Sequence, residues 1–472
     1  MKLYSTRNRK IETTGLNALI QPLAPDGGLW MFELFPIVNW NEWINKPFKE
    51  IVSNVLNVFL SELNEELMTT AINNAYDRFD HPEIINSIFI KHQVVELFYG
   101  PSAAFKDVAL SLLPELTKIA FNQLSINTLP HILTATSGDT GSAALNGFGA
   151  ANYAITVFYP EKGISSIQRK QMTCIDYKDA KVYGIQGNFD DAQRVVKNLF
   201  KNDLKLQFGS ANSINIGRLI PQIAYYFKAY GDAIKNGKID LGNSLSFSVP
   251  SGNFGNAFAG YCAMRLGLPI RHLIIGSNEN DVLTNFFNYG IYDANMLFKH
   301  TLSPSMDILF SSNLERLLYS FSDTDYVKKI MKNLDVEKKY TISDDLKQRI
   351  EQVFKAYSIT ELEMKNTIKS VYENEGYCLD PHTAVAWASA DLYQLENPHQ
   401  AIAVLSTASP YKFPSTVLDA LGYESTVDDF ENLDHLNKII KTPIPVCLDS
   451  LKNKKELHTQ VLTIDQAEHL YD

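Results

Sequence analysis

Cysteine is scarce in this sequence, and its few copies lie far apart. The 472 residues include only four cysteines, which are Cys174, Cys262, Cys378 and Cys447. A disulfide-stapled domain needs cysteines at higher density, and a zinc site needs them in closely spaced pairs. Both classes are therefore excluded, and we expect reduced thiols in the core or at the surface.

The sequence also lacks a long hydrophobic run and an excess of positive charge. No segment is long and apolar enough to span a bilayer, and residues 1–7 contain no apolar signal core. A net charge of -10 gives no general attraction to nucleic acid or to acidic membranes. We expect a cytoplasmic monomer or homodimer that binds a small molecule and neither nucleic acid nor membrane.

Apolar residues, by contrast, are plentiful enough for a large core. With 45% hydrophobic residues over 472 positions, the chain can form more than one domain. Residues 1–94 mix helical periodicity with turns, which predicts a helical N-terminal domain. Beyond this region short apolar strands alternate with helical runs, the pattern of parallel sheets covered by helices on both faces.

The predicted elements divide the chain into three consecutive domains. These are the helical domain 1–94, an α/β domain 95–215 and a larger α/β domain 216–472. Residues 311–372 are charged and helix-rich, so we interpret them as a helical insertion in the last domain. The predicted strands are 131–136, 153–159, 180–185, 244–249, 270–275 and 401–406, and the predicted helices include 51–63, 108–113, 190–201 and 218–234.

A lysine stands at the start of one predicted helix. The stretch reads Gly100-Pro101-Ser102-Ala103-Ala104-Phe105-Lys106-Asp107. The Gly-Pro pair forces a turn and the small residues leave room, so the Lys106 amine would lie against apolar side chains. Desolvation disfavours the ammonium form, and such an amine suits a Schiff base with pyridoxal phosphate. A lysine at a helix start is more often a solvated surface residue, so this stretch alone does not establish a cofactor-binding lysine. The loops downstream provide the further evidence.

A loop rich in hydroxyl groups follows the predicted strand 131–136. It reads Thr136-Ser137-Gly138-Asp139-Thr140-Gly141-Ser142. Two glycines let the backbone curl, and the free amides of the helix that follows attract an anion. The alternative is a structural capping turn, because Ser, Thr and Asp are favoured at helix starts.

The loop after the predicted strand 244–249 has the composition of a phosphate site. It reads Pro250-Ser251-Gly252-Asn253-Phe254-Gly255-Asn256. The glycines permit close backbone approach to a phosphate, and the polar side chains offer hydrogen bonds. The spacing matches neither the nucleoside-triphosphate nor the dinucleotide pattern, so a single phosphate monoester such as that of pyridoxal phosphate fits best. The alternative is a simple glycine-rich turn.

Two further polar stretches extend this pattern. Thr407 follows the predicted strand 401–406, where its hydroxyl could face a pyridine nitrogen, although a capping turn explains it nearly as well. Residues 210–218 combine amides and hydroxyls with Arg218, which suits a second anion because arginine offers a fork of donors. Alternatively, Arg218 simply extends from a helix end. A cofactor phosphate together with a second anion site suggests a phosphorylated amino-acid substrate.

Taken in order along the chain, these motifs resemble the threonine synthase family, in its longer form with an extra N-terminal domain. The resemblance implies a fold type II pyridoxal-phosphate enzyme, similar to the tryptophan synthase β subunit, with two parallel-sheet α/β domains and the active site between them. It extends over nearly the whole chain. The segments that carry it are 100–107, 134–142, 212–218, 251–256 and 406–413, with 23–29 and 187–191 in addition.

The resemblance implies a role for each residue that matches a family motif. Lys106 would bind the cofactor pyridoxal 5'-phosphate covalently and then act as the main acid and base. Thr407 would face the pyridine nitrogen, and the cofactor phosphate would be held by Gly252, Asn253, Phe254 and Asn256. The residues on the substrate side would be Ser137, Asp139 and Thr140, and the candidates for the substrate phosphate are Asn212, Ser213, Arg218 and Lys412.

The implied reaction converts O-phospho-L-homoserine and water to L-threonine and phosphate, the last step of threonine biosynthesis. The chain departs from the family pattern at Tyr99, where many members have histidine, and at Ser102-Ala103, which replaces Thr-Leu. It departs again at Ser409 and Tyr411, which replace a histidine and an alanine.

The missing histidine leaves a second interpretation open. This is a related lyase that releases phosphate, 2-oxobutyrate and ammonia, or one that acts on another activated amino acid. A third interpretation is a catalytically silent relative that binds a metabolite or has a structural role. We disfavour the third because Lys106 and the phosphate loop are both present.

Overall fold

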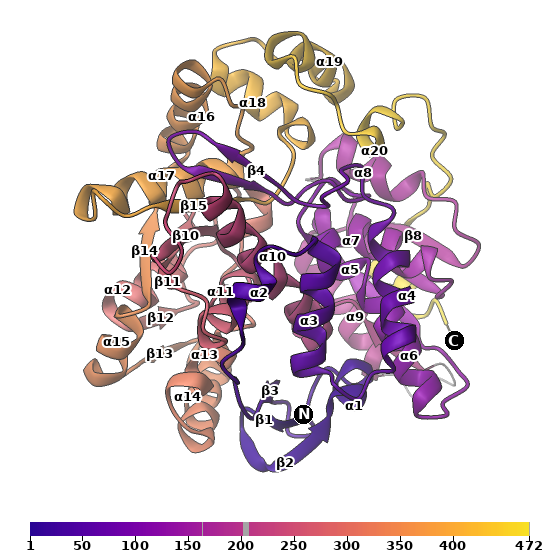
Figure 1. Cartoon of the computed structure of the whole chain (residues 1–472). Coiled ribbons are helices and arrows are strands. Elements are labelled where there is room, and N and C mark those ends of the chain that lie inside the picture. Colours follow the sequence, from indigo (N-terminus) through magenta and orange to yellow (C-terminus); the bar gives the residue numbers. More distant parts are fainter. Residues whose placement is uncertain (163, 202–206, 472) are drawn as a thin grey trace. The chain divides into compact units, whose positions relative to one another are not determined.

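The computed structural model describes residues 1–162, 164–201 and 207–471 (Figure 1). Contacts divide the chain into two compact units. Unit 1 contains Met1–Leu63, Ile85–Leu97 and Ser213–Thr407. Unit 2 contains Asn64–Ile84, Phe98–Asn212 and the chain from Ala408 onward.

These units cut the chain differently from the three predicted domains. The predicted boundary after residue 215 lies close to the change of unit at 212/213. The predicted boundary after residue 94 falls inside a segment that belongs wholly to unit 1. Because the units alternate along the chain, a division into consecutive domains does not describe them, and the three-domain scheme stays a prediction.

A six-stranded sheet forms the centre of unit 1. Its order is β14-β11-β10-β15-β5-β4, and all neighbours are parallel except β4 and β5. The predicted strands 244–249, 270–275 and 401–406 are found as β10, β11 and β15. The bounds are β4 Asn86–Phe89, β5 Gln93–Glu96, β10 Leu245–Pro250, β11 Ile270–Ser277, β14 Phe354–Ser358 and β15 Ile402–Ser406.

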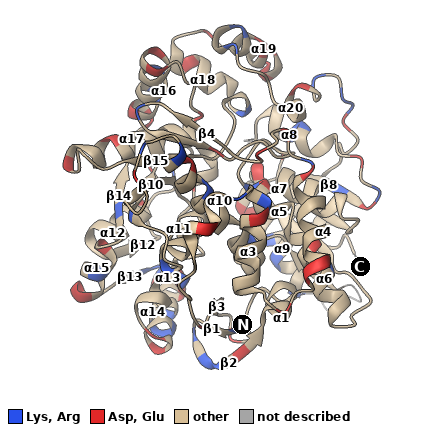
Figure 2. Ribbon diagram, viewed as in Figure 1, with Lys and Arg blue, Asp and Glu red and all other residues tan. Residues whose placement is uncertain are grey.

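The section 311–372 supplies one strand of this sheet, so the prediction of a helical insertion there is wrong in that respect. Its strand β14 pairs in parallel with β11. In β14 only Phe354 and Ala356 are buried, and a five-residue strand with alternating burial is easily missed among charged helices. The charged helices of this section (Figure 2) are α13 Leu314–Phe321, α14 Thr324–Glu337, α15 Asp344–Glu351 and α16 Glu361–Glu375.

Long apolar helices cover the sheet of unit 1. Helix α17 packs on β10, β11 and β15, and helix α10 packs between α3 and α11. The predicted helices 51–63 and 218–234 correspond to α3 and α10. The bounds are α3 Phe48–Phe59, α10 Ile216–Lys235, α11 Gly255–Arg265, α12 Val282–Tyr289 and α17 Pro381–Glu396, with the short η2 at Pro304–Met306.

The N-terminal region is helical, as predicted, but it also contains a small antiparallel sheet of order β2-β1-β3. Strand β2 is mostly polar and β3 has only three residues, so neither stands out in sequence from a turn-rich region. The elements are β1 Lys2–Ser5, β2 Asn8–Thr14, β3 Trp30–Phe32, α1 Gly15–Ile20 and α2 Trp40–Trp43. A second small pair, β12 Ile291–Asp293 with β13 Lys339–Thr341, is also antiparallel.

Unit 2 is built on a five-stranded parallel sheet of order β16-β8-β7-β6-β9. The predicted strands 131–136, 153–159 and 180–185 are found as β6, β7 and β8. Two short strands at the edges were not predicted. The bounds are β6 His131–Ala135, β7 Ile155–Pro160, β8 Ala180–Ile185, β9 Phe208–Ser210 and β16 Val461–Leu462.

A hydrophobic cluster in unit 2 joins the sheet to the C-terminal part of the chain. Leu133, Phe158 and Leu199 belong to it, together with Leu462 and Ala467. The helices of this unit include α4 Glu65–Tyr76, α5 Lys106–Leu110, α6 Leu113–Gln123, α7 Asp139–Ala144, α8 Ser166–Thr173, α9 Phe189–Lys201, α18 Pro414–Leu421, α19 Asp429–Ile440, α20 Val446–Asp449 and α21 Ile464–Glu468. The shorter elements are the π-helix η1 Leu145–Gly149 and the 3-10 helix η3 Pro410–Lys412.

Acidic and basic residues are interspersed along the helices of each unit (Figure 2). Within the described ranges, no helix is long and apolar enough to cross a membrane. The cytoplasmic location stays a prediction from the sequence.

Two close contacts hold the short helix α5 in unit 2. The Asp107 carboxylate accepts hydrogen bonds from the Ser102 amide and hydroxyl, both at 2.8 Å, which closes the loop before the helix. Burial nevertheless raises the pKa of Asp107 to about 6. At the other end of α5, the Leu110 carbonyl lies directly against Gly147 of η1, where a side chain would not fit.

Replacing Gly147 with alanine should destabilise the protein strongly. The new Cβ would lie 1.9 Å from the Leu110 carbonyl oxygen, so backbone would have to move. We expect a loss of about 3 kcal/mol in the free energy of unfolding, measured in urea. The control is Gly422→Ala, whose Cβ meets no described atom within 4 Å and whose left-handed φ of +84° costs only about 1 kcal/mol. Equal losses in the two variants would contradict this packing.

Asp107 should also make stability depend on pH. Because its folded pKa lies above the unfolded value, ionisation of this group costs stability as pH rises from 4 through 6. The Asp107→Asn variant cannot ionise, so it should gain about 2 kcal/mol relative to the wild type between pH 4 and pH 7. Urea titrations at both pH values test this, with Asp345→Asn, an 81% exposed carboxylate on α15, as the control for removing a carboxylate from the surface. A constant difference between Asp107→Asn and wild type would refute the assignment.

Candidate active site

The predicted site residues form two groups, one in each unit. Lys106, Ser137, Asp139, Thr140 and Lys412 belong to unit 2. Unit 1 contains Ser213, Arg218, Gly252, Asn253, Phe254, Asn256 and Thr407. Asn212 is the last residue of its segment in unit 2, so the stretch 212–218 crosses the boundary between the contact units.

Lys106 is the first residue of α5, as the turn at Gly100-Pro101 predicted. Its side chain is only 13% exposed, so the amine is largely removed from water. The predicted helix 108–113 is interrupted, because α5 ends at Leu110 and α6 begins at Leu113. Ala103, with a left-handed φ of 53°, donates its amide to the Gly100 carbonyl and completes the turn before the lysine.

The loop after β6 brings a carboxylate to Lys106. The Thr136 hydroxyl accepts the amides of Gly138 and Gly141, both at 2.9 Å, which curls the loop into helix α7. Asp139 is the first residue of α7, and its Oδ2 lies 3.8 Å from the Lys106 Nζ. The same loop places Ser137 at the surface, with Thr140 half-buried beside it.

The segment 408–413 adds a second lysine to this group. The Lys412 side chain is fully buried, and its Nζ lies 2.7 Å from Asp139 Oδ1. It also donates to the Ser102 carbonyl at 2.7 Å. Ser409, in place of the family histidine, caps η3 by accepting the Tyr411 amide at 3.3 Å. Tyr411 itself is buried, and its hydroxyl donates to the Thr442 carbonyl at 2.5 Å.

In unit 1 the predicted phosphate loop joins β10 to α11. Phe254 caps the helix with a left-handed φ of 62°, and the free amides of the first turn follow directly. Adjacent segments hold the loop carbonyls. Ser311 donates to the Gly252 carbonyl at 2.8 Å, and Asn313 donates its amide and side chain to the Asn253 carbonyl at 3.2 and 3.1 Å. These contacts were not predicted, because Ser311 and Asn313 lie in the section interpreted as an insertion.

Two tyrosines fix the orientation of the Asn256 side chain. Tyr225 and Tyr226 both donate to Asn256 Oδ1, the second at 3.0 Å. The Asn256 Nδ2 is buried and has no hydrogen-bond partner among the described residues. Ser251 Oγ, five residues earlier, is buried in the same unsatisfied state within those ranges. Both tyrosines lie in the apolar helix α10, and their bonds to Asn256 were not predicted from the sequence.

These unsatisfied donors fit an anion such as a phosphate. A buried donor without an acceptor costs about 1–3 kcal/mol, so a native protein rarely keeps one unless a ligand completes it. The loop combines two such side chains with helix amides and with Gly252, whose added Cβ would lie 3.3 Å from backbone of the 305–306 segment. The residues of this loop therefore match the phosphate of pyridoxal phosphate.

Thr407 and Ser213 lie near this loop in the fold of unit 1. Thr407 follows β15, which pairs in parallel with β10, so both strands end at the same sheet edge. The Asn313 side chain bonds the Ser213 carbonyl at 3.3 Å as well as the Asn253 carbonyl. Arg218 is buried in the first turn of α10, and burial lowers its pKa to about 10.

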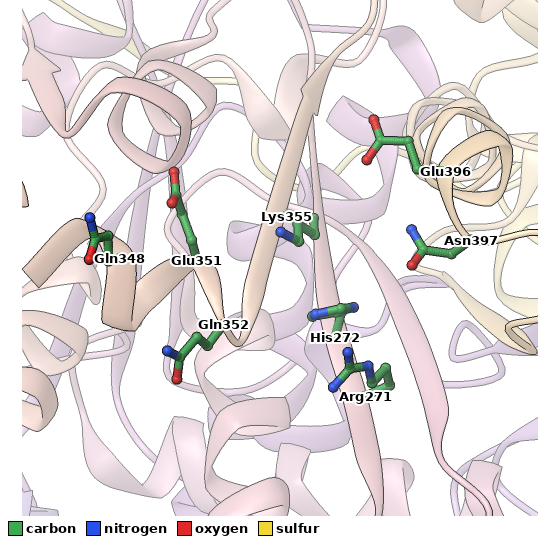
Figure 3. Close-up of a pocket in the computed structure, with 8 residues that line it drawn as sticks. All are labelled: Arg271, His272, Gln348, Glu351, Gln352, Lys355, Glu396 and Asn397. Atoms are coloured by element: carbon green, nitrogen blue, oxygen red, sulfur yellow. The ribbon is translucent and has the colours of Figure 1, made fainter. Parts of the chain in front are cut away.

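A separate polar pocket opens at the other end of the unit 1 sheet (Figure 3). It lies at the beginnings of β11 and β14, whereas the phosphate loop follows the end of β10. The pocket is therefore separate from the loop predicted to hold the cofactor phosphate. The residues around it are Arg271, His272, Gln348, Glu351, Gln352, Lys355, Glu396 and Asn397.

Three family models together match most of the chain. A model described as "Threonine synthase N terminus" matches residues 2–76. One described as "Pyridoxal-phosphate dependent enzyme" matches residues 86–407, and one described as "Threonine synthase, C-terminal" matches residues 383–467.

Individual proteins are similar to this chain over most of its length. The threonine synthase of Saccharomyces cerevisiae is 32% identical over 501 residues, which cover 96% of this chain and 97% of that protein. Threonine synthase-like 1 of Homo sapiens is 35% identical over 431 residues, which cover 86% of this chain and 57% of that protein. The crystal structure of PLP-bound threonine synthase from Brucella melitensis has a TM-score of 0.89 and 35% identity, covering 100% of this chain and 99% of its own.

The predicted fold class is confirmed by these matches, as is the cofactor pyridoxal phosphate. The Saccharomyces protein matches along almost its full length, and the pyridoxal-phosphate model covers both the Lys106 loop and the phosphate loop. This chain therefore belongs to the threonine synthase family of pyridoxal-phosphate-dependent enzymes.

Proposed function

We propose that the protein converts O-phospho-L-homoserine and water to L-threonine and phosphate. Family membership supports the reaction, and one structural observation supports the cofactor chemistry: the phosphate loop keeps two buried donors, on Ser251 and Asn256, unsatisfied within the described residues. A phosphate group would complete both.

The cofactor would be held by the residues that the sequence indicated. Lys106 would bind it covalently, Thr407 would face its pyridine nitrogen, and the phosphate would be held by Gly252, Asn253, Phe254 and Asn256. When bound, pyridoxal phosphate supplies an electron sink for negative charge that develops at the substrate α carbon. A neutral threonine hydroxyl at the ring nitrogen would leave that nitrogen largely unprotonated.

The chain itself supplies the proton transfers and the orientation of the substrate. The Lys106 amine, largely excluded from water, would remove the proton at the substrate α carbon and return a proton there at the end. Ser137, Asp139 and Thr140 would line the substrate side. Bonds from a fixed anion site would orient the substrate phosphate and stabilise it as it leaves.

For the substrate phosphate we propose Asn212, Ser213 and Arg218. Arg218 is buried at the start of α10, and its guanidinium offers a fork of donors that suits a phosphate oxyanion. Lys412 was predicted with them, but its ammonium is bonded to Asp139 and to the Ser102 carbonyl, which supports a role inside unit 2 instead.

The replacement of the family histidine by Ser409 keeps a second candidate open. Ser409 caps η3, and its neutral hydroxyl is a far weaker acid and base than the imidazole of a histidine. A lyase that hydrolyses the same substrate to 2-oxobutyrate, ammonia and phosphate would need no late acid at that position. Alternatively, another activated amino acid is the substrate.

Product analysis separates these candidates. We expect purified protein with O-phospho-L-homoserine to release phosphate and threonine in equal amounts, and Lys106→Ala to release neither because the covalent anchor and base are gone. Phosphate and 2-oxobutyrate in equal amounts would identify the lyase instead. Retention of the cofactor absorbance without turnover would reject the substrate and keep the cofactor assignment.

Ser251→Ala should weaken cofactor binding without harming the free protein. Its hydroxyl has no protein partner among the described residues, so we expect the unfolding temperature without cofactor to stay the same or rise. The loss of one hydrogen bond to a charged phosphate should raise the Kd for pyridoxal phosphate roughly ten-fold. Thermal unfolding and a fluorescence titration measure the two effects.

Ser248→Ala on β10 is the matched control for that experiment. Its hydroxyl donates to the Ala386 carbonyl at 2.6 Å and takes no part in the loop. It should lower stability by about 1 kcal/mol and leave the Kd for pyridoxal phosphate unchanged. The reverse pattern in the two variants would show that Ser251 is structural.

A further inference from the structure

Lys412 is a buried charge whose partners are known. Its side chain is 0% exposed, and its Nζ bonds Asp139 Oδ1 and the Ser102 carbonyl, each at 2.7 Å. An ammonium taken out of water is tolerated only when it is paired and hydrogen-bonded. The pair with Asp139 therefore accounts for the burial of this lysine without any ligand.

The same contacts connect Lys412 to two segments beside Lys106, the loop before it and the loop that carries Asp139. Ser102 belongs to the loop that leads into Lys106, and Asp139 Oδ2 lies 3.8 Å from the Lys106 Nζ. The loop is tied to the 408–413 segment at two more points, the bridge between Ala104 and Ala408 and the amide of Ser409 bonded to the Ala103 carbonyl at 3.2 Å. The Asp139 carboxylate is further held by Gln168 Nε2 at 3.1 Å.

We infer that Lys412 is a positioning residue that acts through Asp139 on Lys106, and that it does not bind the substrate phosphate. Its ammonium balances the Asp139 carboxylate and holds it in place, so the carboxylate can orient the Lys106 amine without retaining it as a tight ion pair. This inference rests on the proposed function, because it concerns the attachment of pyridoxal phosphate to Lys106.

The chemistry of attachment shows what the pair controls. The unprotonated Lys106 amine forms a bond to the aldehyde carbon of pyridoxal phosphate, and the aldehyde oxygen leaves as water. An amine held as ammonium against an unbalanced carboxylate cannot make this attack. Without Lys412, Asp139 would lose the cation bonded to its Oδ1 while its Oδ2 stays 3.8 Å from the Lys106 Nζ, and attachment should slow.

The test is the rate at which pyridoxal phosphate becomes attached to Lys106. Samples of the folded apoprotein are quenched with borohydride at intervals, and the modified peptide is quantified by mass spectrometry. We expect Lys412→Met, which keeps the apolar stem, to slow attachment roughly ten-fold or more. The double variant Lys412→Met/Asp139→Asn removes both charges, and it should match Asp139→Asn alone within roughly three-fold.

Tyr411→Phe is the control for disturbance of η3. Tyr411 lies in the same short helix as Lys412, and the variant removes its hydroxyl bond to the Thr442 carbonyl. This variant leaves the Lys412 pair intact. Its attachment rate should equal that of the wild type. A slow Tyr411→Phe variant would mean that any change in the segment has this effect, which would overturn a specific role for the ion pair.

Other outcomes also decide the inference. Attachment to Lys412→Met at the wild-type rate, or a double variant roughly ten-fold slower than Asp139→Asn, would overturn it, because the two residues would then act independently. The second comparison remains decisive even if Lys412→Met alone fails to fold. If wild-type Lys106 takes up no cofactor, the proposed function itself is wrong, whereas a wild type that makes threonine while Lys412→Met attaches normally rejects only this inference.

Discussion

Parallel pairing of strands is the constraint on which both groups of site residues depend. In unit 1, β10 and β15 run side by side in the same direction, so the phosphate loop and Thr407 follow their strands at one edge. In unit 2, β6 and β7 are also parallel, and the loop after β6 carries Asp139. A parallel strand must be followed by a crossover, usually a helix, and this is why each polar loop leads into a helix start.

The same constraint explains which elements the sequence could predict. Strands buried on both faces, such as β10 and β15, have continuous apolar runs that few other structures share. Edge strands do not. In β14 burial alternates, and β9 is only three residues long. The hydrophobic pattern of each strand is therefore too weak to be told apart from the helices and turns around it. The small N-terminal sheet was missed for the same reason, because its strand β2 has no fully buried residue.

The site was predictable where the backbone itself requires a residue type. Gly138 adopts a φ of +147°, and a Cβ there would lie 2.5 Å from the Gln168 side chain. The position therefore requires glycine, and a required glycine makes the motif recognisable in the sequence. The partners that orient a motif residue were not predictable. Tyr225 reaches Asn256 from a different helix, and Lys412 reaches Asp139 from 273 positions further along the chain. Such pairings are set by tertiary packing, and one sequence alone shows no correlation between the positions.

The interleaving of the two contact units has a consequence for synthesis on the ribosome. The hydrophobic cluster of unit 2 includes Leu462 and Ala467, which are made only after all of unit 1 up to Thr407 has emerged. Strand β16 likewise completes the edge of the sheet beside β8 from the end of the chain. The part that carries Lys106 therefore stays open while the chain grows, with its apolar edge exposed to chaperones, and a ribosome that stops early would release a chain whose lysine loop lacks the segment that anchors it.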